Sequence, residues 1–115
     1  MEGINQVMKE TRLERKVKLI NSIAMLVIKS DKYVNQRWDY NNRHLIFNDK
    51  YENGFGVRLV QDTKTNNYEV ALGLRSRGVH LGVTKIKSRK DFLEFMANIE
   101  FQMLSALKAV EKLKQ

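Results

Sequence analysis

The hydrophobic positions of this 115-residue chain change their spacing twice. From residue 11 to residue 29, apolar side chains recur every three or four residues, which is typical of a helix. From residue 33 to residue 86 the period is two, and clusters of Asn, Asp and Gly interrupt it as hairpin turns do. From residue 88 to residue 114 the three-and-four spacing returns. The pattern predicts an α+β fold with an N-terminal helix, a four- to five-stranded antiparallel meander sheet and a long C-terminal helix.

Capping residues support both helix predictions. Thr11 with Glu14, and Ser88 with Asp91, stand three residues apart at the start of each periodic segment. A hydroxyl followed three residues later by a carboxylate satisfies free amide groups at a helix N-terminus. We therefore expect the helices to begin beside Thr11 and Ser88.

Three runs in the middle region alternate most clearly, and each has an apolar side and a small or polar side. The apolar sets are Phe55, Val57 and Leu59; Tyr68, Val70, Leu72 and Leu74; and Val79, Leu81 and Val83. The opposite sets are Gly56, Arg58 and Val60; Glu69, Ala71 and Gly73; and His80, Gly82 and Thr84. Glycine weakens a strand interior, and two explanations remain open: the close approach of a ligand, or strong curvature with a bulge. The sequence thus predicts one apolar face and one shallow, nearly bare face.

The C-terminal segment carries an unbroken apolar stripe in four-three alternation. Its members are Phe92, Met96, Ile99, Met103, Ala106, Val110 and Leu113. A helix of about 26 residues is roughly 39 Å long, which is more than a domain of this size covers from end to end. We therefore predict a homodimer through this helix, with coverage by the N-terminal helix of the same chain as the alternative.

Composition excludes several classes of protein. The chain is 43% hydrophobic and 30% charged, which is typical of a globular protein, and no run approaches the roughly 18 apolar residues of a membrane span. It contains no cysteine, so disulfides, thiol nucleophiles and thiolate metal sites are excluded. We expect a single domain over residues 1–115, cytoplasmic and not associated with a membrane.

The net charge of +8 is unevenly distributed. Residues 75–90 contain six Lys or Arg and no Asp or Glu, whereas residues 31–74 contain six of each kind. A concentrated positive charge creates a local potential that attracts phosphates. The predicted phosphate-binding residues are Arg37, Arg58, Arg75, Arg77, His80, Lys85, Lys87, Arg89 and Lys90. Trp38 and Tyr40 are the candidates for stacking on bases.

No residue pattern indicates catalysis, a metal or a cofactor. The two histidines, His44 and His80, lie in separate predicted strands, and no cluster has the spacing of metal ligands. Asp62 and Lys64 resemble a nuclease fragment, but they lie in a turn rich in Asn and Thr, where Asp is expected for its backbone hydrogen bonds. We therefore predict a protein that is not an enzyme and has no cofactor.

These observations favour a non-enzymatic nucleic-acid-binding protein that takes single-stranded DNA or RNA with weak sequence preference. One alternative is an accessory or inhibitory protein of a phage or mobile element, whose basic strip binds an acidic protein partner. The second alternative is a small, metal-independent ribonuclease of the toxin kind. In that enzyme, His80 beside Arg75 or Arg77 would be the acid-base residue.

Overall fold

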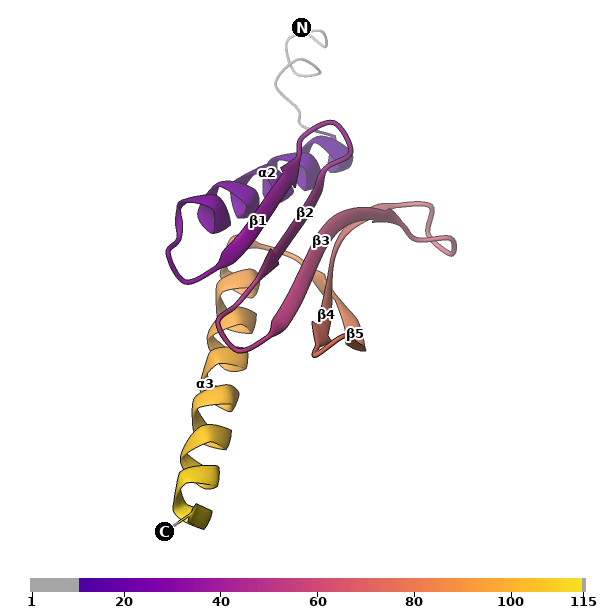
Figure 1. The fold of residues 1–115 in the computed structure, drawn as a ribbon. Coiled ribbons are helices and arrows are strands. Elements are labelled where there is room, and N and C mark those ends of the chain that lie inside the picture. The colour runs from indigo at the N-terminus through magenta and orange to yellow at the C-terminus, as the bar shows by residue number, and fades with distance from the viewer. Residues whose placement is uncertain (1–10, 115) are drawn as a thin grey trace, which may run out of the picture.

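The structure is a computed structural model that describes residues 11–114. Two helices and five strands follow one another in the predicted order, which confirms the α+β fold (Figure 1). They are α2 (Arg12–Lys29), β1 (Val34–Asp39), β2 (His44–Asn48), β3 (Asn53–Gln61), β4 (Tyr68–Ser76), β5 (Val79–Ile86) and α3 (Arg89–Lys114). Each strand pairs antiparallel with the next, so the sheet has the meander order β1-β2-β3-β4-β5.

Both predicted capping pairs are confirmed. The backbone N–H of Glu14 donates to the hydroxyl of Thr11 at 3.1 Å, and that of Asp91 donates to the hydroxyl of Ser88 at 3.1 Å. The Asp91 carboxylate in turn accepts a hydrogen bond from the backbone of Lys87 at 3.0 Å. Local side chains thus satisfy free amide groups where each helix begins.

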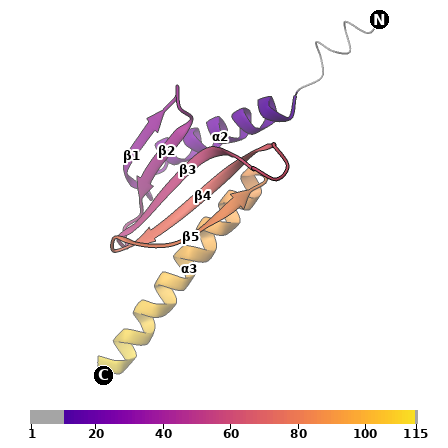
Figure 2. The same ribbon diagram turned by 90° about the vertical axis from the view of Figure 1, so that its right-hand side faces the viewer.

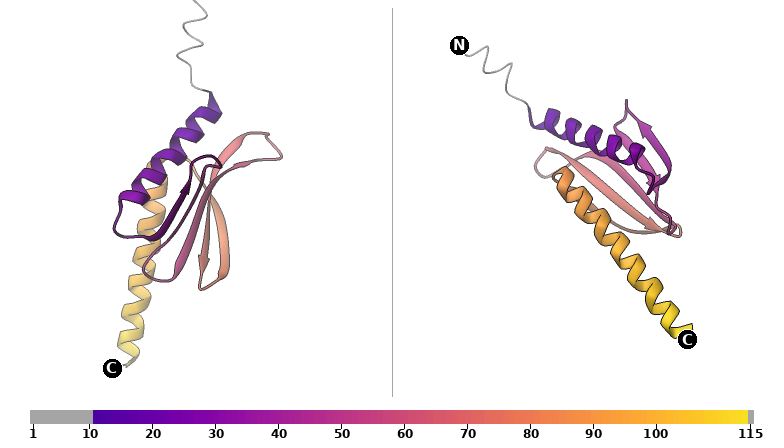
Figure 3. Two further views of the ribbon diagram at one scale, coloured as in Figure 1. Left: turned by 45° about the horizontal axis from the view of Figure 1, so that its top comes forward. Right: turned by 90° about the vertical axis from the view of Figure 1, so that its left-hand side faces the viewer.

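The two helices lie on one face of the sheet and leave the other face uncovered (Figures 2 and 3). The core between helices and sheet is formed by the apolar sides of β2, β3 and β4 together with the inner sides of α2 and α3. At its centre, the ring of Phe47 stacks on Phe55 at a centroid distance of 5.0 Å and meets Phe92 edge-on at 6.3 Å. This aromatic cluster ties α3 to the sheet.

A two-residue turn joins β4 to β5. Arg77 and Gly78 both have positive φ, 52° and 81°, which is the conformation of the tight hairpin turn whose twist matches the strands. Gly78 adopts this conformation without the steric cost that a Cβ atom brings.

The β5 strand departs from the predicted alternation because the ladder shifts register between Leu74 and Arg75. Leu74 pairs with Gly82, but Arg75 pairs with His80, so Leu81 has no partner on β4. An unpaired residue of this kind reverses which side chains face which way along the strand. The next paragraph follows the consequence for β5.

Gly73 pairs with Val83, and Leu72 pairs with Thr84. Val83 therefore lies on the open face and Thr84 on the helix-facing side, so the predicted faces of these two residues were wrong. His80 still reaches the open face, because it lies beyond the shift and opposite Arg75.

Only the first half of α3 is packed against the rest of the molecule. Phe92 and Met96 are buried, and Ile99 packs against the core, but the helix then runs on past the sheet (Figures 1 and 2). Within residues 11–114, none of the helices is sufficiently long and apolar to span a membrane.

Candidate nucleic-acid interface

The open face of the sheet is hollowed into a trough with a volume of about 680 Å³. Three cross-strand rows define it, because residues paired across neighbouring strands point to the same side. Read from β2 to β5, they are a central row of Ile46, Gly56, Gly73 and Val83, a first end row of His44, Arg58, Ala71 and Lys85, and a second end row of Asn48, Gly54, Arg75 and His80. The rows place small residues in the middle and cationic residues at both ends.

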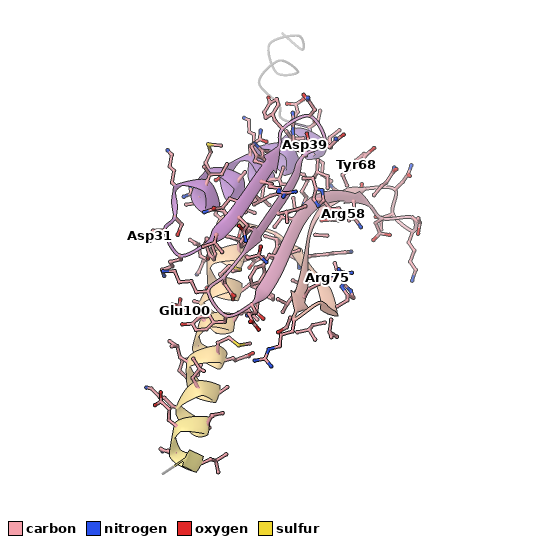
Figure 4. The ribbon with its side chains drawn as sticks, in the orientation of Figure 1. Asp31, Asp39, Arg58, Tyr68, Arg75 and Glu100 are labelled. Carbon is pink, nitrogen blue, oxygen red and sulfur yellow. The ribbon has the colours of Figure 1, made fainter. Side chains whose placement is uncertain are left out.

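Both end rows are positively charged. Arg58 and Arg75 are exposed on this face, and Figure 4 shows them projecting from β3 and β4. Among the described residues that line the trough, none is acidic. Two guanidinium groups without a carboxylate between them favour a ligand with more than one negative charge.

Lys85, at the β5 end of the first row, has an acidic partner. Its Nζ lies 3.2 Å from the Asp62 carboxylate in the loop between β3 and β4. A hydrogen bond from the backbone N–H of Lys64, followed by the one from Lys85, lowers the pKa of Asp62 below its usual value. Asp62 is therefore ionised at neutral pH and offsets part of the charge of Lys85.

The central row is apolar at its sides and bare in its middle. Ile46 and Val83 are 42% and 64% exposed, respectively, although both are large apolar side chains. Between them, Gly56 and Gly73 lie directly opposite each other on β3 and β4. The floor of the trough is therefore peptide backbone.

The six cations of residues 75–90 do not form a single patch. Arg75 and Lys85 lie on the trough face, as described above. Arg77 is at the tip of the β4–β5 hairpin, where its Nε lies 3.2 Å from the Glu52 carboxylate. That pair is highly exposed, so it adds little to stability and leaves Arg77 accessible.

The other three predicted cations surround the start of α3. Lys87 lines a shallow depression with Arg12 and Arg15 of α2, two cations that the sequence did not place near it. The other two, Arg89 and Lys90, lie apart from this depression. Arg89 borders the C-terminal part of α2, and the Nζ of Lys90 lies 3.8 Å from the carboxylate of Glu94 one turn along α3.

The two candidate stacking residues have different surroundings. Trp38 pairs with the buried Leu45, so it faces the helices, where it is partly buried and packs against the core. We therefore leave it out of the interface. Tyr40 is exposed beside the β1–β2 loop, and the guanidinium of Arg43 lies 4.1 Å from its ring centroid. One face of that ring is already occupied by a cation.

Two further basic residues share the trough face. Arg37, which the sequence did select, pairs with Ile46 on β2 and therefore lies on the same side. His44, which it did not select, lines the trough opposite Arg58. Its position depends on the pairing of β2 with β3, which the irregular alternation around residue 44 does not reveal.

The described residues also bear on catalysis and metal binding. Within residues 11–114, no three or more His, Cys, Asp or Glu side chains gather where they would hold a metal ion. His80 and Arg75 are direct cross-strand neighbours, which is the arrangement that the ribonuclease alternative requires. Comparisons with protein-family models, with curated proteins and with solved structures returned no match. The chemistry of this face is therefore the basis for assigning a function.

Proposed function

We propose that the protein is a non-enzymatic, cytoplasmic nucleic-acid-binding protein whose open sheet face holds a single strand. One observation carries the proposal. Two rows of basic side chains, centred on Arg58 and Arg75, flank a trough in which no described lining residue is acidic. Such an arrangement binds successive phosphates of one chain.

The shape of the site favours a single strand with weak sequence preference. A volume of about 680 Å³ is on the scale of a bound nucleotide, whereas duplex readers insert a projecting helix or ribbon into a groove. Neither α2 nor α3 projects from the trough face. Phosphate contacts fix position without reading sequence, so we expect similar affinities for strands of different sequence.

We further propose that the protein is a homodimer through the C-terminal half of α3. We call residues 101–113 the stalk. Its large apolar side chains are exposed, with Phe101 at 70% and Leu113 at 86%. They continue the face of α3 that covers the core through Phe92 and Met96. A helix face that is apolar beyond the reach of its own sheet is well suited to a second copy of the same helix.

The nucleic-acid proposal is tested by removing the two trough arginines. Each phosphate contact of a single strand contributes about 0.7 to the slope of log affinity against log salt, so about four contacts give a slope near −3. Arg58→Gln with Arg75→Gln should lower that slope by about 1.4 and weaken binding for all strand sequences alike. Fluorescence anisotropy with labelled oligothymidylate at several salt concentrations measures both effects.

The matched control keeps the same change in net charge away from the trough. Lys108→Gln with Lys112→Gln removes two exposed cations from the stalk and should leave affinity and slope nearly unchanged. Equal losses in the two double variants would show that attraction comes only from diffuse net charge, which would overturn the site. A wild-type protein that binds neither single- nor double-stranded nucleic acid at low salt would overturn the function.

A further inference from the structure

The glycines at positions 56 and 73 cost stability, since glycine in a strand interior is destabilising by roughly 0.5–1 kcal/mol relative to alanine. They occupy the middle of two central strands and lie opposite each other. Three intramolecular reasons would explain them: a backbone conformation open only to glycine, crowding by a neighbour, or a bulge. The structure allows each reason to be examined.

None of the three applies. The positive-φ glycines among the described residues are Gly78 and Gly82, so Gly56 and Gly73 have ordinary strand backbone. The ladder between β3 and β4 runs without a shift from end to end. A Cβ atom on Gly73 would lie 3.9 Å from its nearest neighbours, and one on Gly56 would lie 3.7 Å from Nε2 of His44, which are ordinary contact distances. A methyl group therefore fits at both positions.

What a side chain at these positions would fill is the trough itself. The floor lies between Ile46 and Val83, two apolar side chains that remain largely exposed. Apolar walls on a flat peptide floor accommodate a flat, weakly polar ring better than they accommodate a phosphate, which needs donors. A nucleobase has that shape, and every base presents such a face.

The distance to the charged rows fits the same ligand. Each end row lies two residues from the central row along the strands, or about 7 Å, and the two end rows are about 13 Å apart. Arg58 in one end row and Arg75 in the other are then placed for the phosphates on either side of a single unstacked nucleotide. The described residues put no aromatic ring in any of the three rows.

We infer that the trough seats one unstacked base of a single strand flat on the Gly56–Gly73 floor, with flanking phosphates on the two end rows. This inference rests on the proposed function and adds to it that the base, and not only the phosphate chain, is bound. The bare floor is then the feature that separates a single strand from a duplex, whose bases are already paired and stacked.

The test compares two probes and needs no knowledge of a natural ligand. One probe is oligothymidylate, and the other is an abasic oligomer of equal length, which keeps the phosphates and lacks the bases. The wild type should bind oligothymidylate about tenfold or more tightly than the abasic oligomer. Gly73→Val should bind both probes as weakly as the wild type binds the abasic one, while urea unfolding shows a fold at least as stable as the wild type.

Two further variants make the result specific. Gly56→Ala, a smaller change on the neighbouring strand, should lower the preference in the same direction. Thr84→Ile enlarges an exposed side chain on the opposite face of β5 and should keep the wild-type preference. Equal wild-type affinity for the two probes, or an unchanged preference in Gly73→Val, would overturn the seated base. In either case, loss of affinity in the variant that lacks Arg58 and Arg75 would still support the proposed function.

Discussion

Replacing Val110 with Asp tests the stalk because it changes the dimer far more than the monomer. Val110 is 47% exposed and Leu107 49% exposed in the single chain, so an aspartate at position 110 is already half solvated there. In a paired stalk both side chains are covered, and a carboxylate among apolar groups is costly unless it finds a partner. The substitution also occurs twice in a symmetric dimer.

The size of the effect follows from these exposures. Losing the remaining apolar burial of Val110 and burying part of a carboxylate costs about 2 kcal/mol per copy, or about 4 kcal/mol per dimer. Since about 1.4 kcal/mol corresponds to a factor of ten, the dissociation constant should rise about a thousandfold. The monomer should keep its fold, because Phe92 and Met96 hold the other half of α3 in the core.

Light scattering at tens of micromolar gives the result directly: a dimer for the wild type and a monomer for Val110→Asp. Ser105→Asp is the matched control, since it adds the same charge at an exposed position away from the apolar face of the stalk. It should stay dimeric. A monomeric wild type at that concentration would refute the reasoning, and so would a Val110→Asp protein that remains dimeric with its circular dichroism unchanged.

Two other results are expected. Asp62→Asn should strengthen binding to oligothymidylate, because it frees the charge of Lys85 while keeping the oxygen that accepts the hydrogen bond from Lys64. Since the pKa of Asp62 is lowered, this carboxylate stays ionised from pH 8 to pH 5, so the gain over the wild type measured by anisotropy should be constant over that range. The purified protein should also leave labelled RNA and DNA intact with or without divalent metal; cleavage that copurifies with it and disappears in His80→Ala would make it a ribonuclease.

The sheet could be predicted from the sequence where alternation is uninterrupted. Gly56 and Arg58 on β3, and Ala71 and Gly73 on β4, lie on the open face as the period of two required. Local order fixes these positions, because the side-chain direction in a strand changes with every residue. The register shift near Leu81 could not be predicted, since an extra residue in a strand leaves the composition of the run unchanged.

The charged surface depends on pairing that the sequence does not reveal. The run of cations from residue 75 to residue 90 passes through a hairpin, a strand and a helix start, so its members point in different directions. The trough instead collects Arg58, Arg75 and His44 from three strands. Charge density along the chain therefore predicted the sign of the surface and only part of its membership.

The trough and the stalk lie on separate parts of the molecule, and this separation has a consequence for binding. The trough faces away from both helices, whereas the stalk extends α3 beyond the sheet (Figures 2 and 3). Pairing two stalks therefore leaves both troughs open and joins them at a fixed separation. A strand long enough to reach from one trough to the other binds the second at high effective concentration, while a short strand occupies one trough alone. Dimerisation would then set the length of strand that the protein prefers, while the Gly56–Gly73 floor and the two arginines set the affinity of each site.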